Sequence, residues 1–298
     1  MTTVGVIGLG KMGLPIAQNL MERGFNVVGY RRSGTAELAA LGGTGAQSAA
    51  EVASSSDVLL SILPDVAALR EVILGPNGTL TKLRPGTVHV EMSTLDVPEK
   101  AALRERVRSS GGDLMDCPIS GTPAMVRPRA ATTFVSGEEA SVDAVREVLD
   151  AISGPWVYTG AFGTGARLKY VASLLVAVHT VATAEAMLLA RRSGLDLELV
   201  QRTLDDSIAS SAIWQRRGPL VRDRRWTPAP GPIATLHEIL DQIEDQAAAI
   251  GTTLPLFAVA KQLYDKALAD GWGALDIAAV HDLLSGQDPS SAEPGNTP

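Results

Sequence analysis

The chain has 298 residues, of which 45% are hydrophobic and 20% are charged, and its formal net charge at pH 7 is −7. Such a chain can fill sizeable cores in two domains, whereas the acidic charge and the lack of a long basic run argue against a nucleic-acid partner. The four histidines lack metal-ligand spacing, so we expect no metal site. The single cysteine, Cys117, excludes an intrachain disulfide. The low cysteine content fits a reducing compartment, and a strand pattern begins almost at Met1. We therefore expect a cytoplasmic protein without a signal peptide.

The first predicted elements form a strand–turn–helix unit. An apolar strand at 3–7 leads through a G-x-G-x-x-G turn into an amphipathic helix at 13–23, and the turn reads Gly8-Leu9-Gly10-Lys11-Met12-Gly13. The first glycine of such a turn permits a tight bend, the second lets the backbone approach a pyrophosphate, and the third lets the helix pack closely on the strand. We therefore expect these six residues to bind a dinucleotide, with its diphosphate at the N-terminus of the helix.

The next predicted strand, at 26–30, ends in Arg31-Arg32-Ser33. An acidic side chain at this point would bind the ribose 2′-hydroxyl of NAD, whereas arginine accommodates the 2′-phosphate of NADP. Two guanidinium groups and a hydroxyl suit a phosphate dianion, because charge-assisted hydrogen bonds are strong. The three residues predict NADP in preference to NAD, and a pair of solvated surface arginines is the alternative interpretation.

Residues 1–163 alternate strand and helix patterns, which predicts an α/β domain with a doubly wound, mostly parallel sheet of the Rossmann type. Further strands are expected at 57–62, 87–91, 113–116, 132–136 and 156–159, and helices at 35–41, 48–54, 65–73, 97–109 and 140–152. Leu63, Pro64 and Thr94 follow strands, at the edge where doubly wound sheets bind ligands. We therefore include these three residues in the predicted cofactor site.

Residues 164–286 show helical periodicity without a strand pattern and predict an all-α second domain. Its expected helices cover 166–193, 196–209, 233–250, 255–270 and 275–284. The proline-rich stretch 216–232 predicts a loop, and the composition of 287–298 predicts a disordered tail. We interpret the apolar run at 168–190 as a buried helix and not as a membrane span. The apolar surface of this half leads us to expect a homodimer or a homotetramer.

Two later segments carry candidate catalytic groups. Asp116-Cys117-Pro118-Ile119-Ser120-Gly121 follows a strand, and the hydroxyl of Ser120 and the N–H of Gly121 can both donate to a carboxylate or an oxyanion. Gly163-Thr164-Gly165-Ala166-Arg167-Leu168-Lys169 leads into the long apolar helix, with Lys169 in its first turn. Ser173 shares the face of Lys169 at helical spacing. An ordinary turn serine and a solvent-exposed lysine at the helix end are the alternative interpretations.

Together these segments resemble the β-hydroxyacid dehydrogenase family, which includes 3-hydroxyisobutyrate dehydrogenase and relatives of 6-phosphogluconate dehydrogenase. The family pattern G-x-G-x-M-G, S-T, D-x-P-x-S-G-G and G-x-G-x-x-x-K is matched in order by Gly8–Gly13, Ser93-Thr94, Asp116–Gly121 and Gly163–Lys169, except that Thr122 replaces the last glycine of the third segment. The resemblance covers about residues 3–284 and implies that Lys169 is the catalytic acid/base and that Ser120 and Gly121 hold a substrate carboxylate. This agrees with the chemistry, because hydride transfer from an alcohol needs a group that takes the hydroxyl proton.

The chain departs from the family pattern at several positions. Ser173 stands where the family has a substrate-contacting asparagine, and the family's later Lys-Asp pair is missing near His237. Arg127 and Arg129 add positive charge after the substrate turn, which suits an extra anionic group. We expect NADP-dependent hydride transfer to or from a small 3-hydroxy acid or its semialdehyde. The alternatives are an imine-reductase-like enzyme, which normally lacks the lysine, and a cofactor-binding protein with little catalysis.

Overall fold

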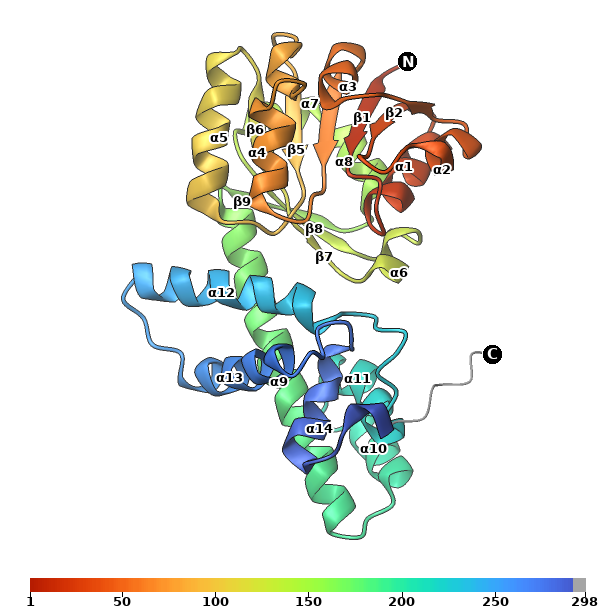
Figure 1. The fold of residues 1–298 in the computed structure, drawn as a ribbon, viewed down its shortest axis with the longest axis vertical. Coiled ribbons are helices and arrows are strands. Elements are labelled where there is room, and N and C mark those ends of the chain that lie inside the picture. The colour runs from red at the N-terminus through yellow and green to blue at the C-terminus, as the bar shows by residue number, and fades with distance from the viewer. Residues whose placement is uncertain (292–298) are drawn as a thin grey trace. The chain divides into compact units, whose positions relative to one another are not determined.

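The computed structural model describes residues 1–291, which divide into two compact units (Figure 1). The first unit comprises Met1–Lys169, and the second comprises the described residues from Tyr170 onward. The division falls in the first part of helix α9 (Thr164–Arg192) and not at residue 163, because the first turn of this helix belongs with the sheet.

The first unit is built on one sheet with the strand order β3-β2-β1-β4-β5-β6-β8-β7, and β9 pairs with β8. The strands are β1 (Thr3–Ile7), β2 (Asn26–Tyr30), β3 (Thr44–Gly45), β4 (Val58–Ser61), β5 (Val88–Glu91), β6 (Asp113–Asp116), β7 (Ile119–Ser120), β8 (Thr132–Ser136) and β9 (Trp156–Gly160). Neighbours from β3 to β6 are parallel, whereas β8 runs antiparallel to β6 and β7. This mixed but mostly parallel sheet confirms the predicted α/β fold.

Helices cover both faces of this sheet. They are α1 (Gly13–Glu22), α2 (Ala36–Ala40), α3 (Ala49–Ser55), α4 (Val66–Leu74), α5 (Val97–Ser109), α6 (Pro123–Val126), α7 (Glu139–Ala144) and α8 (Arg146–Ile152), with a 3₁₀ turn at Thr79–Thr81. All four residues of β4 and of β5 are buried, as expected for central strands covered on both faces. Asp65 and Asp96 cap α4 and α5 by accepting backbone hydrogen bonds of 2.7 and 2.9 Å.

The second unit, among its described residues, has helices joined by loops as its regular elements. It contains the rest of α9 and α10 (Leu197–Asp205), α11 (Ala212–Asp223), α12 (Ile233–Ala249), α13 (Pro255–Ala269) and α14 (Val280–Ser285), with 3₁₀ turns at Ile277–Ala279 and Pro289–Ser291. Its buried aromatic side chains include Trp214, Trp226, Phe257 and Tyr264.

Helix α11 occupies residues 216–223 of the stretch 216–232, all of which we expected to be a loop, whereas residues 224–232 lie outside any helix. The helix continues past Pro219, although a proline inside a helix removes a hydrogen bond and crowds the preceding turn. Trp214 and Val221 lie buried on one face of this helix, and their packing outweighs the cost of the proline. A second difference is that the single helix predicted at 140–152 forms two helices, α7 and α8.

Two further expectations differ from the structure. Residues 289–291, within the stretch that we expected to be disordered, form a 3₁₀ turn held by Arg224, which donates to the Asp288 carbonyl at 3.0 Å. Residues 292–298 of that stretch lie outside the described residues. Helix α9 is only partly buried: it is long and apolar enough to cross a membrane, but 39% of its most apolar window is buried inside the chain.

Candidate active site

The glycine turn at the end of β1 has the geometry of a dinucleotide cradle. Gly8 has a φ of +100°, and a Cβ there would lie 2.1 Å from the carbonyl oxygen of Ile62. A Cβ on Gly13 would lie 1.9 Å from the carbonyl oxygen of Gly8, so only glycine lets α1 start this close to the strand. A Cβ on Gly10 would meet nothing within 4 Å. The chain thus leaves open space at the position where the backbone of such turns approaches a diphosphate.

Arg31 is tied to this turn. Its Nη1 donates a hydrogen bond of 2.8 Å to the Leu9 carbonyl, and its Nη2 lies 3.3 Å from a carboxylate oxygen of Glu37. The neighbouring Arg32 and Ser33 are exposed, as is Lys11 in the turn, and Met12 is partly buried at the start of α1. The end of β2 therefore presents one arginine that braces the turn and a second arginine that faces solvent.

The remaining predicted cofactor residues lie at the carboxyl ends of β4 and β5. The backbone N–H of Leu63 donates to the Ser93 hydroxyl at 2.8 Å, which joins the two loops. Pro64 is exposed and Thr94 is partly buried beside this contact. Sequence reasoning used Ser93 only as part of a motif, whereas the structure shows that its side chain shapes this edge of the sheet.

The candidate catalytic groups Ser120 and Lys169 are 49 residues apart in the sequence and in contact in the structure. Lys169 Nζ lies 3.3 Å from the Ser120 hydroxyl oxygen, which accepts its hydrogen bond. Burial lowers the pKa of Lys169 to about 8, because a buried ammonium loses its hydration. Ser120 pairs with Thr132 in the short ladder of β7 and β8, and a Cβ on Gly121 would lie 2.8 Å from Ala131 Cβ.

A buried charge network that sequence reasoning missed lies behind these two residues. Lys100 on α5 is fully buried, and its Nζ donates to Asp116 Oδ1 at 2.7 Å and to the Ser93 carbonyl at 2.6 Å. It also pairs with Glu91 at the end of β5. Desolvation alone would lower the pKa of Lys100, but Asp116 and Glu91 outweigh it and raise this pKa. The sequence signal was a carboxylate at the end of each of two apolar strands.

Two family models match the chain. The NAD binding domain of 6-phosphogluconate dehydrogenase matches residues 3–160. The NAD-binding region of NADP-dependent 3-hydroxyisobutyrate dehydrogenase matches residues 163–284. The chain belongs to the β-hydroxyacid dehydrogenase family. It is therefore an NAD(P)-dependent oxidoreductase of the kind that acts on CH–OH groups.

Named relatives cover almost the whole chain of this β-hydroxyacid dehydrogenase. The mitochondrial 3-hydroxyisobutyrate dehydrogenase of Mus musculus is 31% identical over 305 residues, which cover 97% of this chain and 88% of the relative. L-threonate dehydrogenase of Cupriavidus necator is 32% identical over 294 residues, which cover 97% of this chain and 99% of the relative. The crystal structure of 3-hydroxyisobutyrate dehydrogenase from Salmonella typhimurium matches with a TM-score of 0.86 at 27% identity, covering 95% of this chain and 100% of that one.

Ser173, at the position of the family asparagine, follows Lys169 by one turn of α9. This spacing places the two residues on the same side of the helix. Ser173 is 3% exposed, and its side chain is shorter than asparagine, with a hydroxyl in place of an amide. The dehydrogenase therefore has a smaller side chain next to its lysine than the family pattern provides.

The structure gives both of the added arginines contacts within the first unit. Arg127 donates to Asn19 Oδ1 and to Glu22, both on α1, and lowers the pKa of the Glu22 carboxyl. Arg129 donates to the Asp150 carbonyl at 2.9 Å. Arg127 is therefore paired with an acidic side chain of the first unit, and the guanidinium of Arg129 is held by a backbone carbonyl of α8.

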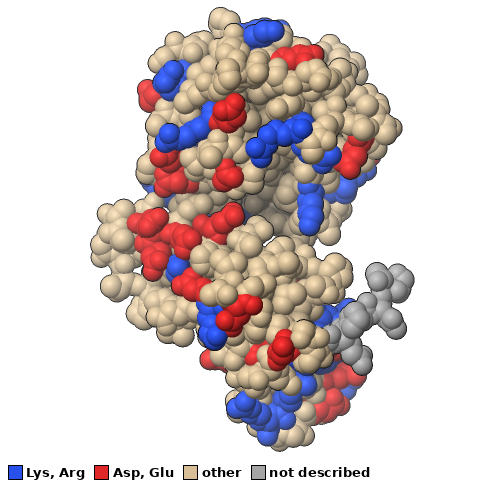
Figure 2. All heavy atoms as spheres, viewed as in Figure 1, with Lys and Arg blue, Asp and Glu red and all other residues tan. Residues whose placement is uncertain are grey.

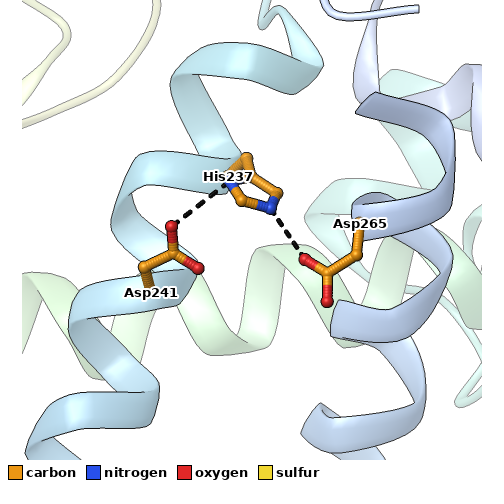
Figure 3. A group of neighbouring side chains, drawn as sticks. All are labelled: His237, Asp241 and Asp265. Carbon is orange, nitrogen blue, oxygen red and sulfur yellow. Dashed lines mark hydrogen bonds and ion pairs between the residues drawn. The ribbon is translucent and has the colours of Figure 1, made fainter. Parts of the chain in front are cut away.

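A second polar cluster lies on α12 and α13, in the region of the missing Lys-Asp pair. His237 contacts Asp265 at 2.7 Å and Asp241 at 3.4 Å (Figure 3), and acidic side chains gather over α12 (Figure 2). These three residues can place one ligand atom each within 4.8 Å of the others, a juxtaposition that sequence reasoning missed although His237 and Asp241 are four residues apart. Lys261 Nζ lies 3.0 Å from both carboxylates, so the cluster carries its own cation.

Proposed function

We propose that this β-hydroxyacid dehydrogenase moves a hydride between NADP and a small 3-hydroxy acid or its semialdehyde, with Lys169 as the general acid/base. The observation that carries the proposal is the contact between Lys169 Nζ and the Ser120 hydroxyl at 3.3 Å, together with the pKa of about 8 that burial gives the lysine. A lysine with an ordinary pKa near 10.5 would be almost fully protonated at neutral pH. At a pKa of about 8 both protonation states are available for proton transfer.

Each group has a defined role in the alcohol oxidation. The bound nicotinamide supplies the acceptor for the hydride. The neutral amine of Lys169 takes the hydroxyl proton while the carbon–hydrogen bond breaks, which leaves a carbonyl and an ammonium. In the reverse direction the ammonium returns the proton to the new alkoxide. The Ser120 hydroxyl accepts from Lys169, so its own proton is available for a substrate carboxylate, with the Gly121 N–H as a second donor.

NADP in preference to NAD is supported by the end of β2. Arg32 and Ser33 are exposed there, and no carboxylate stands at the strand end to accept a ribose hydroxyl. The nearby carboxylate of Glu37 is paired with Arg31. The opening left at Gly10 fits the diphosphate of either dinucleotide, so the choice between them depends on the arginines.

Steady-state turnover tests the proposal. The enzyme is incubated with NADP and a panel of small 3-hydroxy acids, and with NADPH and the matching semialdehydes, and Lys169→Ala is measured beside it. We expect the substitution to lower kcat by about 10²-fold or more while the dissociation constant of NADPH stays within about twofold. Turnover that survives the substitution would remove the lysine from the mechanism.

The same experiment separates the two alternatives. An imine-reductase-like enzyme would reduce cyclic imines faster than aldehydes, and Lys169→Ala would not slow it. A cofactor-binding protein would bind NADPH and turn over none of the compounds. The lysine in contact with Ser120 favours the dehydrogenase over both.

The exposed side of α9 supports a homo-oligomer. Val171, Leu175 and Leu189 are 57%, 47% and 70% exposed, and their spacing places them on one face of the helix. Large apolar side chains exposed along one helix face favour a protein interface, and symmetric pairing of a second copy would cover them. Sedimentation at micromolar concentration should give a dimer or tetramer, and Leu189→Glu should shift it toward the monomer.

A further inference from the structure

The first turn of α9 is fixed to the sheet by the carboxylate of Asp116. Asp116 Oδ2 accepts the backbone N–H of Ala166 at 2.8 Å, three residues before Lys169. Ser136 adds a second link. Its hydroxyl lies 2.8 Å from the Asp116 backbone carbonyl and 3.1 Å from Asp116 Oδ2, to which it donates, and it accepts the N–H of Gly163 at 3.2 Å. These bonds satisfy helix-start N–H groups that have no partner within the helix.

The backbone in this turn approaches the strands more closely than a side chain would permit. A Cβ on Gly165 would lie 2.6 Å from the Phe134 carbonyl oxygen and 2.8 Å from that of Asp116. Asp116 also ends β6, four residues before Ser120. The same residue therefore binds the start of α9, which carries Lys169, and begins the segment that carries Ser120, the contact partner of Lys169.

Lys100 orients this carboxylate by donating to its Oδ1. Its buried ammonium is surrounded by three acceptors, which are Asp116, Glu91 and the Ser93 carbonyl. An isolated charge at a fully buried position is strongly destabilising, so each member of the network depends on the others. The two oxygens of Asp116 thus have separate tasks: Oδ1 binds Lys100, and Oδ2 binds the first turn of α9.

We propose that Asp116, held by Lys100, is a positioning residue that fixes the first turn of α9 and thereby the contact of Lys169 with Ser120. The inference rests on the proposed function in one respect, namely that Lys169 transfers the proton. An asparagine at position 116 has one acceptor oxygen and one NH₂ donor. Its oxygen can take the place of either Oδ1, which accepts from Lys100, or Oδ2, which accepts from Ala166, so one of the two donors loses its acceptor.

The test compares Asp116→Asn with Asp113→Asn, two matched substitutions at opposite ends of β6. Asp113 accepts from Arg104 at 3.0 Å and from Ser141 at 2.8 Å, and neither bond involves α9. The reactivity of the Lys169 amine toward acetic anhydride is measured across pH by peptide mass spectrometry. This measurement gives the pKa of Lys169 without any substrate.

We expect Asp116→Asn to raise the pKa of Lys169 by about one unit or more, toward the ordinary lysine value, as the loosened turn admits water. Loss of a negative charge alone would lower this pKa, so an upward shift identifies movement of the turn. Asp113→Asn should leave the pKa within about 0.3 units. Asp116→Asn should also lower kcat by about tenfold or more, with the NADPH dissociation constant within about twofold.

An unchanged or lowered pKa of Lys169 in folded Asp116→Asn would overturn the inference. If that variant does not fold, Ser136→Ala removes the second link without changing any charge, and the same upward shift is expected on a smaller scale. An unshifted pKa in Ser136→Ala would then overturn the inference. An enzyme without turnover on any hydroxy acid or aldehyde would contradict the proposed function alone, since the labelling experiment does not need activity.

Discussion

The guanidinium of Arg31 donates a 2.8 Å hydrogen bond to the carbonyl oxygen of Leu9 and thereby ties the end of β2 to the glycine turn. This bond connects the two parts of the chain that bind the two ends of an adenine-ribose-diphosphate unit in such folds. It gives the two adjacent arginines different surroundings. Arg31 contributes to the shape of the turn, whereas Arg32 is free to contribute to nucleotide selectivity through its exposed side chain.

The two arginines should therefore respond differently to substitution. Arg32→Ala should weaken NADPH about tenfold or more and NADH within about twofold, because only NADPH has the 2′-phosphate that a guanidinium binds. Arg31→Ala should weaken both nucleotides, because it removes the support of Leu9. Isothermal titration with each nucleotide checks this. Equal losses of NADPH and NADH in Arg32→Ala would contradict the assignment of NADP selectivity to Arg32.

The glycine turn allows a second matched comparison. Gly10→Ala meets no atom within 4 Å, so the variant should fold with a free energy of unfolding within about 0.5 kcal/mol of the original. Its methyl group should nevertheless block the diphosphate and weaken NADPH about tenfold or more. Gly13→Ala places a Cβ 1.9 Å from the Gly8 carbonyl and should cost about 1–3 kcal/mol of stability. Urea unfolding and nucleotide titration measure the two effects, and an undiminished affinity of Gly10→Ala would place the diphosphate elsewhere.

The strands and the glycine turn could be predicted because their signals are local. A short apolar run followed by G-x-G-x-x-G specifies β1, the turn and α1 with no information from distant residues. The contact of Lys169 with Ser120 joins residues 49 positions apart and was reached only through the family resemblance. Nothing in the sequence indicated that Lys100 is buried, because a lysine in a helix is normally exposed to solvent. Only the tertiary packing brings the carboxylates of Asp116 and Glu91 to it.

The errors have physical causes of the same kind. Pro219 reads locally as a helix breaker, but buried neighbours on its helix outweigh that cost. Arg127 reads as a free cation beside the substrate turn, but Glu22 is more than 100 positions away in the sequence and bonds to it. Both outcomes depend on tertiary contacts that a periodicity argument does not contain.

Two lysines of α13 allow a test of whether the ammonium of Lys261 stabilises the cluster of His237, Asp241 and Asp265. Lys261→Met removes the largely buried ammonium between Asp241 and Asp265 and should lower the free energy of unfolding by about 1–2 kcal/mol, since it leaves the two carboxylates near each other without a cation between them. Lys266→Met removes an exposed pair with Asp270 and should cost less than about 0.5 kcal/mol. Chemical unfolding at pH 7 gives both values. Equal effects would show that Lys261 is no more than a surface charge.

The pH dependence of turnover follows from the pKa of Lys169, about 8. Alcohol oxidation needs the neutral amine, so its kcat/KM should rise with pH through this value. Carbonyl reduction needs the ammonium, so its kcat/KM should fall through the same value. Rates in both directions from pH 6 to 10 check the prediction. In Lys169→Ala both the rising limb for oxidation and the falling limb for reduction should disappear from the pH profiles. Limbs that remain in that variant would assign the titration to another group.

The same lysine should reduce the stability of the folded enzyme at neutral pH. Its pKa is about 8 in the folded chain and about 10.5 in the unfolded chain, so the unfolded chain binds more protons between these values. Stability contributed at this site is therefore lowest below pH 8 and increases until about pH 10.5. Lys169→Met should raise the free energy of unfolding at pH 7 by about 1–3 kcal/mol, and the gain should shrink toward pH 10. Lys82→Met, at an exposed position, should show no such gain. A Lys169→Met gain that is independent of pH would mean that the lysine is hydrated in the folded enzyme, and it would remove the basis for its lowered pKa.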